Sequence, residues 1–137
     1  MPGSFFDTNV LIYLAASDPS KADRVETIVS DGGTISVQVL NELANVARRK
    51  MRLSWHDTRT FLSTIRGLLL VNPITTEIHD NGLALAERYG LSIYDAMIVA
   101  SALHAECGVL WSEDMQDGMT IEKRLRVVNP FVRRKPK

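Results

Sequence analysis

The sequence contains little that would cross-link a protein or anchor it in a membrane. Its single cysteine, Cys107, excludes an intramolecular disulfide and has no second thiol with which to build a zinc site. No apolar run approaches the roughly 20 residues that a spanning helix needs. The N-terminus lacks a basic segment followed by a long apolar one, so we expect a cytoplasmic protein with no secretion signal and no membrane contact.

An excess of positive charge is also absent, since 16 lysines and arginines balance 16 aspartates and glutamates. Neutrality argues against a partner as anionic as nucleic acid, because phosphate binding rests on lysine and arginine. The basic residues are clustered, however, with Arg48, Arg49, Lys50 and Arg52 in one group and four more within 133–137. Each group is either a solvated surface or a phosphate contact. Bound cations would cancel the acids that make the chain neutral.

Short apolar segments alternate with amphipathic ones, and 45% of the 137 residues are apolar. This predicts one domain with a substantial core, residues 1–131, followed by a basic tail at 132–137. Because parallel strands need crossover connections that are usually helical, we expect an α/β fold, a three-layer α/β/α sandwich around a parallel sheet of four to five strands. Strands are predicted at 4–6, 34–37, 68–71, 109–111 and 126–128, and helices at 8–15, 19–30, 38–50, 54–67, 76–89 and 93–106.

Four acids are placed to meet at one edge of this sheet. Asp7 and Asp114 each follow a predicted strand, and the carboxyl ends of parallel strands share an edge. Asp95 lies in the first turn of a predicted helix and Glu42 one turn into another, and both can lean over the same edge. The sequence therefore brings four carboxylates from four different elements to one place.

Most of these acids also have a local explanation. Asp7 could cap the helix that follows it, Asp95 completes a capping-box pattern with Ser92, and Asp114 could belong to an ordinary turn. Glu42 differs, because no residue three or four positions away offers it an ion-pair partner along the helix. Only the combination points to a shared site.

That combination predicts a metal site. Two carboxylates about 4 Å apart repel by about 4 kcal/mol at an effective dielectric of about 20. A hard divalent cation neutralises such a group best, and a set of oxygen ligands without histidine or cysteine suits Mg²⁺ or Mn²⁺ rather than zinc. The chemistry that needs such a site is attack of a metal-activated water on phosphorus, so the working hypothesis is a phosphodiesterase.

Each acid also stands in a segment that resembles a known motif. The segments are Phe6–Leu11, Ser36–Leu43, Tyr94–Ala102 and Ser112–Gly118. In this order they resemble the motifs of the PIN-domain nucleases, most closely the VapC-type toxins of toxin–antitoxin pairs, and the similarity covers nearly the whole chain. The resemblance implies a PIN-like fold and an endoribonuclease that depends on one or two Mg²⁺ or Mn²⁺ ions. It also implies a cognate VapB-like antitoxin and a homodimer.

The resemblance assigns roles to further residues. It makes Asp7, Glu42, Asp95 and Asp114 the metal-binding and catalytic acids, and Asp117 a candidate for the additional acid that the fourth motif often carries. Asn9 and Ser112 are expected to hydrogen-bond the ligands or a bound water, although Asn9 could instead form an Asx turn at the helix start. Arg48, Arg49 and Arg52 are hypothesised to follow the RNA backbone.

Two rival functions stay open at this stage. In a phosphatase-like α/β domain, the aspartate after the first strand attacks phosphorus itself, usually with a second acid two positions on, where this chain has Asn9. Alternatively, the chain is a catalytically silent module that uses the same fold to dimerise or to hold RNA. A covalent aspartyl-phosphate distinguishes the first rival, and a response to Mn²⁺ distinguishes the second.

Overall fold

The computed structural model describes residues 3–132, and six strands within this range form one sheet. The strands are β1 (Ser4–Phe6), β2 (Thr34–Ser36), β3 (Leu70–Asn72), β4 (Val109–Trp111), β5 (Thr120–Ile121) and β6 (Leu125–Val128). Their order across the sheet is β3-β2-β1-β4-β6-β5, and every neighbouring pair is parallel except β5 with β6. Of the predicted basic tail, 133–137 lies outside the described residues.

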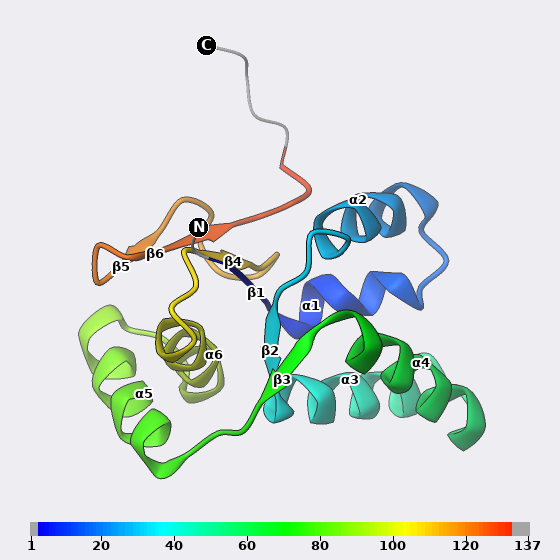
Figure 1. Ribbon diagram of the computed structural model, residues 1–137, viewed down its shortest axis with the longest axis horizontal. Coiled ribbons are helices and arrows are strands. Elements are labelled where there is room, and N and C mark those ends of the chain that lie inside the picture. Colours follow the sequence, from blue (N-terminus) through cyan, green and yellow to red (C-terminus); the bar gives the residue numbers. More distant parts are fainter. Residues whose placement is uncertain (1–2, 133–137) are drawn as a thin grey trace.

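Helices cover both faces of this sheet. They are α1 (Thr8–Leu11), the 3₁₀ helix η1 (Ile12–Leu14), α2 (Pro19–Val29), α3 (Val37–Arg49), α4 (Trp55–Leu68), α5 (Thr76–Tyr89) and α6 (Ile93–His104). Figure 1 shows α5 and α6 on one side of the sheet and α1 to α4 on the other. The predicted α/β/α sandwich is therefore confirmed, and the one helix predicted at 8–15 is in fact α1 followed by η1.

Serine caps set the start of the two helices that carry predicted site residues. The Ser36 side chain accepts a hydrogen bond from the backbone N–H of Val39 at 3.4 Å, at the start of α3. Ser92 accepts one from the N–H of Asp95 at 3.2 Å, at the start of α6. Each bond satisfies an N–H group that the first helical turn leaves unpaired. These caps fix where the two helices begin, and α3 begins directly after the end of β2.

The core lies on both sides of β1 and around α6. Phe5 and Phe6 are fully buried, as are most of the side chains from Ala96 to Ala102. A helix that is apolar on all sides is a buried helix, and α6 packs against both α5 and β2. Within residues 3–132, no helix is long and apolar enough to cross a bilayer. The buried α6 holds Asp95, in its first turn, at a defined place.

The sixth strand, β5, is not predicted from the sequence. It has two residues and pairs with β6 in an antiparallel hairpin, so it shows no alternation that could reveal it. The turn between them places Glu122 and Lys123 at φ values of 52° and 57°. Such turns usually carry Asn and Gly, and neither residue is present here. Helix α4 also runs to Leu68, which delays β3 beyond its predicted start.

Candidate functional site

The predicted site lies at the end of β1. The chain extends the sheet on one side of this strand with β2 and β3, and then on the other side with β4. β1 is paired with β2 on one side and with β4 on the other, and Phe6 is in register with Trp111. In an open parallel sheet, ligands bind at the carboxyl ends of the strands beside such a switch point. Asp7 follows β1 directly, and its backbone N–H donates to the Trp111 carbonyl at 2.9 Å. The ends of β1 and β4 are thus fastened together at this point.

Asp7 is the most buried of the four acids, with an exposed fraction of 4%. It occupies the cap position of α1, yet its side chain makes no capping hydrogen bond. Instead its Oδ2 atom accepts hydrogen bonds from the Ser112 hydroxyl at 2.9 Å and from Asn9 Nδ2 at 3.3 Å. The local explanation of Asp7 as a side-chain cap is therefore wrong, and the carboxylate is turned toward the end of β4.

Burial raises the pKa of Asp7 from 3.8 to about 7. The Ser112 hydrogen bond lowers this pKa, because it favours the charged form, while the carboxylates of Asp95 and Glu42 raise it further. Neither of the two ion pairs within residues 3–132 involves Asp7. Asp7 is therefore a buried carboxylate whose surroundings carry negative charge and supply no paired cation.

Glu42 is held by side chains from two helices. Its Oε2 accepts a hydrogen bond from the Thr8 hydroxyl at 2.5 Å, and its Oε1 accepts one from Gln38 Nε2 at 3.0 Å. The same Gln38 nitrogen donates to the Tyr94 carbonyl at 3.3 Å. Gln38 therefore links the Glu42 carboxylate on α3 to the residue that precedes Asp95 on α6.

Asp95 and Asp114 complete the acidic edge. Burial raises the pKa of Asp95, the charges of Asp114 and Glu42 add to that effect, and a hydrogen bond with Ser92 opposes it. Asp95 is half-buried, whereas Asp114 is exposed. The acids from the end of β1, from α3, from α6 and from the loop after β4 line a common space.

That space is a pocket of about 670 Å³, and all four acids line it. Asn9, Gln38, Asn41, Asn45 and Lys50 supply further polar lining. Within residues 3–132, no three acidic, histidine or cysteine side chains stand as a preassembled metal-binding group. Carboxylates with no cation between them repel one another, so a spread arrangement is the expected one. The pocket confirms that the fold brings the predicted acids together, and their role stays a prediction.

Comparison with known proteins identifies the family. The sequence profile of the PIN domain matches residues 4–116. The chain belongs to the PIN-domain family. None of the curated proteins matches it.

Solved structures of other proteins share the fold of this PIN domain. A chain from a toxin–antitoxin complex of Klebsiella pneumoniae is 26% identical, with a TM-score of 0.72 over 93% of this chain and 98% of that one. Mycobacterium tuberculosis VapC20, a sarcin-ricin loop cleaving toxin, is 17% identical, with a TM-score of 0.66 over 81% and 89%. VapBC2 of Rickettsia felis, bound to promoter DNA, is 18% identical, with a TM-score of 0.67 over 92% and 98%. The resemblance to PIN domains and VapC toxins is confirmed.

Asn9 and Ser112 lie where they can orient Asp7, but Asp117 does not line the pocket. Ser112 is fully buried, and its hydroxyl also accepts a hydrogen bond from the Met115 N–H at 3.3 Å. Asn9 Oδ1 accepts the Glu113 N–H at 3.0 Å. Asp117 Oδ1 accepts the backbone N–H of Asn129 at 2.9 Å, after the end of β6. Asp117 is therefore hydrogen-bonded to the segment that follows β6, and its role as an additional acid stays a prediction.

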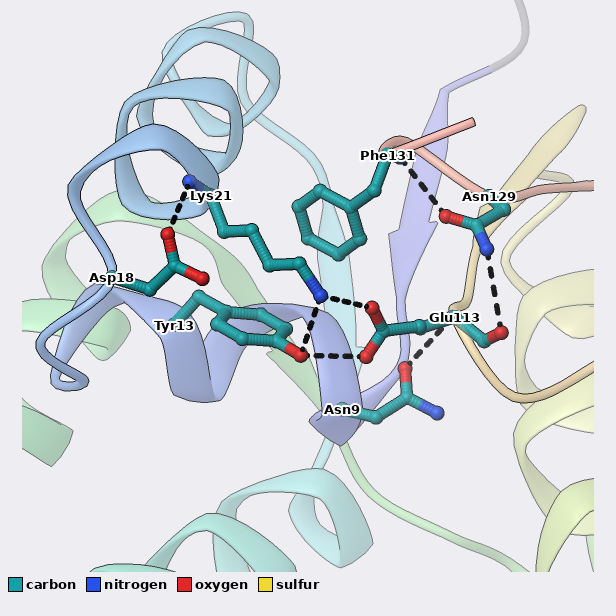
Figure 2. A network of polar contacts seen from close by, with 7 residues as sticks. All are labelled: Asn9, Tyr13, Asp18, Lys21, Glu113, Asn129 and Phe131. Carbon is teal, nitrogen blue, oxygen red and sulfur yellow. Dashed lines mark hydrogen bonds and ion pairs between the residues drawn. The ribbon is translucent and has the colours of Figure 1, made fainter. Parts of the chain in front are cut away.

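A polar network that was not predicted holds the loop carrying Asp114. Figure 2 shows Tyr13 and Lys21 directed at Glu113, whose two carboxylate oxygens accept their hydrogen bonds at 2.7 Å each. Lys21 also lies 4.8 Å from the Phe131 ring centroid and 3.1 Å from the Tyr13 hydroxyl. The hydrogen bond to Glu113 raises the pKa of both Tyr13 and Lys21. This network fastens the loop after β4 to η1 and α2.

The basic residues at the end of α3 and just after it line different parts of the surface. Arg48 and Arg49 line a hollow of about 490 Å³ beside Trp55, and Lys50 lines the acidic pocket. Arg52 lines neither, and it adopts a left-handed backbone conformation with a φ of 55°. The predicted contact between this group and RNA stays a prediction, with Arg48 and Arg49 better placed for it than Arg52.

Sequence reasoning missed the residues that hold the acids in place. Gln38 lies four residues before Glu42, so the two share a helix face, and this spacing could have identified the pair. Thr8 stands beside Asp7 in the first motif, but its contact with Glu42 comes only from the tertiary fold, and nothing in the sequence around Lys21 marks its contact with Glu113. Glu113 was passed over because the acid beside it, Asp114, fits the motif.

The donor set of the PIN domain fits a hard divalent cation. The pocket offers carboxylates and amides, and no histidine or cysteine lines it. The burial of Asp7 tests the fit. A buried carboxylate whose pKa rises to about 7 costs free energy in its charged form unless a positive charge compensates it. Asp7, Glu42, Asp95 and Asp114 are therefore the residues that could hold such an ion.

Proposed function

We propose that this PIN domain is an endoribonuclease that uses Mg²⁺ or Mn²⁺, one or two ions, and that it is the toxin of a toxin–antitoxin pair. The observation that carries the proposal is Asp7, a carboxylate buried at the sheet switch point, facing a pocket with three more acids. It takes part in neither ion pair of residues 3–132. A divalent cation supplies the charge that this arrangement needs.

The proposed ligands are Asp7, Glu42, Asp95 and Asp114, which all line the pocket. When bound, the ion supplies Lewis acidity, lowering the pKa of a water molecule and offsetting charge on the phosphodiester. Because that chemistry does not require a protein base, none of the three histidines is assigned a role. The side chains of the protein have the task of presenting oxygen atoms in fixed positions.

Hydrogen bonds from neighbouring side chains perform that task. Ser112 and Asn9 hold Oδ2 of Asp7, so rotation of the carboxylate is restricted. Thr8 and Gln38 restrict the acid on α3 in the same way. Partners that orient metal ligands typically change metal affinity or activity by about 10- to 100-fold.

RNA is the proposed substrate. VapC20, which shares this fold, is a sarcin-ricin loop cleaving toxin. The pocket has Lys50 at its edge, and the adjoining surface carries Arg48 and Arg49, which suits a phosphate chain better than a small neutral substrate. Arg52 is included in the proposed basic track, as the sequence suggested. Its removal is expected to matter less than removal of the other two arginines.

A protein partner is proposed on the same grounds. The structures from Klebsiella pneumoniae and Rickettsia felis are toxin–antitoxin assemblies, and both cover more than nine-tenths of this chain. We propose that a VapB-like antitoxin blocks the acidic pocket and that the PIN domain works as a cytoplasmic homodimer. Coexpression with the product of the adjacent reading frame, followed by size-exclusion chromatography with light scattering, measures both associations.

The phosphatase-like alternative is less well supported. A carboxylate that attacks phosphorus must present an oxygen to the substrate, whereas Asp7 is 4% exposed and has Oδ2 occupied by two donors. Position 9 carries an amide that donates to Asp7, and no acid stands there to protonate a leaving group. A covalent aspartyl-phosphate trapped by borohydride would revive this alternative.

The deciding experiment measures RNA cleavage and metal binding in the same variants. Asp7→Asn and Asp95→Asn should remove cleavage of a mixed RNA substrate and the rise in melting temperature caused by Mn²⁺, while the fold is retained. Asp80→Asn is the matched control, because Asp80 is an exposed acid on α5 outside the pocket. EDTA should stop cleavage by the parent protein.

Two results count against the proposal. Full cleavage by a folded Asp7→Asn variant excludes the acidic pocket as the active site. A parent protein that neither cleaves RNA nor responds to Mn²⁺ supports the silent-module alternative instead. Mapping the cleaved RNA ends in the active case then identifies the substrate.

A further inference from the structure

Trp55 is an exposed tryptophan in a basic setting outside the acidic pocket. It is the first residue of α4, and its exposed fraction is 58%. The indole therefore presents part of its apolar, aromatic surface to solvent. Its surroundings are cationic. The guanidinium carbons of Arg48 and Arg59 lie 4.2 and 5.7 Å from the centroid of the Trp55 ring.

The arginines around Trp55 have no acidic partner among the described residues. The two ion pairs in residues 3–132 join Lys21 to Glu113 and Arg88 to Glu122. Arg48 is nevertheless fixed in place, because its Nη1 atom donates to the Leu53 carbonyl at 2.6 Å. A guanidinium has five N–H donors, so several remain for an anion.

The surface beside Trp55 is hollowed and adjoins the acidic pocket. Arg48, Arg49 and Trp55 line the hollow of about 490 Å³ together with Ala44 and Asn45. Asn45 also lines the acidic pocket. The two depressions therefore meet at this residue, and one extended ligand can occupy both.

We propose that the hollow at Trp55, Arg48 and Arg49 is a nucleotide-binding subsite for single-stranded RNA that extends out of the acidic pocket. The inference rests on the proposed nuclease function and deepens it. The base stacks on the exposed indole, and the guanidinium groups bind the phosphates on either side. Stacking tolerates any base because every base has a π face, so the subsite adds affinity with little sequence preference.

The geometry of α3 sets the length of RNA required. Glu42 and Arg49 lie seven residues apart on the helix, a rise of about 10 Å at 1.5 Å per residue. Stacked nucleotides advance by about 3.4 Å each, so a strand must continue for about three nucleotides beyond the acids to reach Trp55. A shorter RNA can occupy only one of the two depressions at a time.

The test measures RNA binding in a cleavage-deficient Asp7→Asn background. The probe is a fluorescein-labelled single-stranded RNA of about 12 nucleotides, read by anisotropy, and stacking of one base corresponds to about 5- to 150-fold in affinity. Trp55→Ala should weaken binding by about 5-fold or more, and Trp55→Phe should restore most of it. Arg49→Ala should weaken binding and lower the salt slope by about 0.7. Arg66→Ala, an exposed arginine at the far end of α4, is the control that should change neither.

RNA length provides a second measurement. An RNA of about three nucleotides cannot contact the indole and the acids at once, so it should bind the background protein more weakly than the RNA of about 12 nucleotides does and should still lose affinity in Trp55→Ala. The subsite is overturned if no probe binds the background protein, or if Trp55→Ala and Arg49→Ala bind the longer RNA as Arg66→Ala does. Loss of antitoxin binding in Trp55→Ala with RNA binding intact also overturns it, in favour of a protein contact.

The outcome is separable from that of the proposed function. If the parent protein cleaves RNA with Mn²⁺ and Trp55→Ala cleaves a long RNA equally well at limiting concentration, the nuclease stands and the subsite fails. If the parent does not cleave but Trp55-dependent binding of the longer RNA persists, the subsite stands and the catalytic proposal fails.

Discussion

Replacing Asp7 with asparagine should stabilise the metal-free protein as it removes the metal site. The side chain is 4% exposed and lies among other acids, so its negative charge opposes folding whenever no cation is bound. Asparagine has almost the same shape, and its one oxygen can accept both hydrogen bonds that now end on Oδ2. The substitution therefore removes the buried charge with little change in packing.

The size of the effect follows from the pKa. Below pH 3.8 the carboxyl is protonated in both the folded and the unfolded protein, so its burial carries no charge penalty. Between pH 3.8 and about 7 the unfolded chain releases a proton that the folded protein keeps, and stability falls as the pH rises. At about 1.4 kcal/mol per pH unit, the whole interval corresponds to an upper limit of about 4 kcal/mol.

Urea unfolding in EDTA measures this difference. The free energies of unfolding of Asp7→Asn and of the parent should be similar near pH 4, should diverge up to about pH 7 and should then differ by a constant amount to pH 8, with the variant the more stable. Comparison at each pH cancels the titration of groups that both proteins share. With Mn²⁺ at 100 times its Kd, the parent should gain about 2.7 kcal/mol at neutral pH, and the variant should gain little.

A difference between the two proteins that stays constant from pH 4 to pH 8 would refute the reasoning. It would mean that Asp7 ionises in the folded protein as easily as in the unfolded one. Equal stabilisation of both proteins by Mn²⁺ would refute the metal assignment separately. The Asp80→Asn control should show neither the pH-dependent divergence nor any loss of the Mn²⁺ effect.

Other expectations concern neighbouring parts of the molecule. Asn9→Ala should lower Mn²⁺ affinity or cleavage by about 10- to 100-fold, measured by thermal shift and by initial rates, because it frees both Asp7 and the loop after β4. Alanine at Arg48, Arg49 and Arg52 together should make RNA binding less sensitive to salt, with an unchanged slope excluding a backbone contact. Gly33→Ala should lower the free energy of unfolding by about 1 to 3 kcal/mol in urea, because its Cβ would lie 2.8 Å from the Ser4 carbonyl oxygen at a φ of 156°.

Much of the fold could be predicted because local signals agree with the tertiary structure. The cap residue Ser92 marks a helix start, and the apolar strand before Asp7 is short and bounded. β5 could not be predicted in this way, since two residues carry no period and its turn uses Glu122 and Lys123 in left-handed conformations. The hairpin is held by contacts from elsewhere, including the Tyr89 hydroxyl, which accepts the Glu122 N–H at 3.0 Å.

The sequence by itself determined which residues are candidates. Strands that end in an acid, and helices that begin near one, point to a common edge because parallel strands share their carboxyl ends. The motif order around Asp7, Glu42, Asp95 and Asp114 was enough to predict the family, which the profile match then confirmed.

Only the tertiary structure decided how the acids are held and what surrounds them. Asp7 could equally have been a side-chain cap, and only the tertiary structure shows that its Oδ2 atom instead accepts a hydrogen bond from Ser112 at the end of β4. Lys21 meets Glu113 across 92 positions of the chain, and Asp7, Asp95 and Asp114 line one pocket with residues of α3. The reason is physical: burial, hydrogen-bond partners and pKa depend on neighbours in space, and a local pattern carries no record of them.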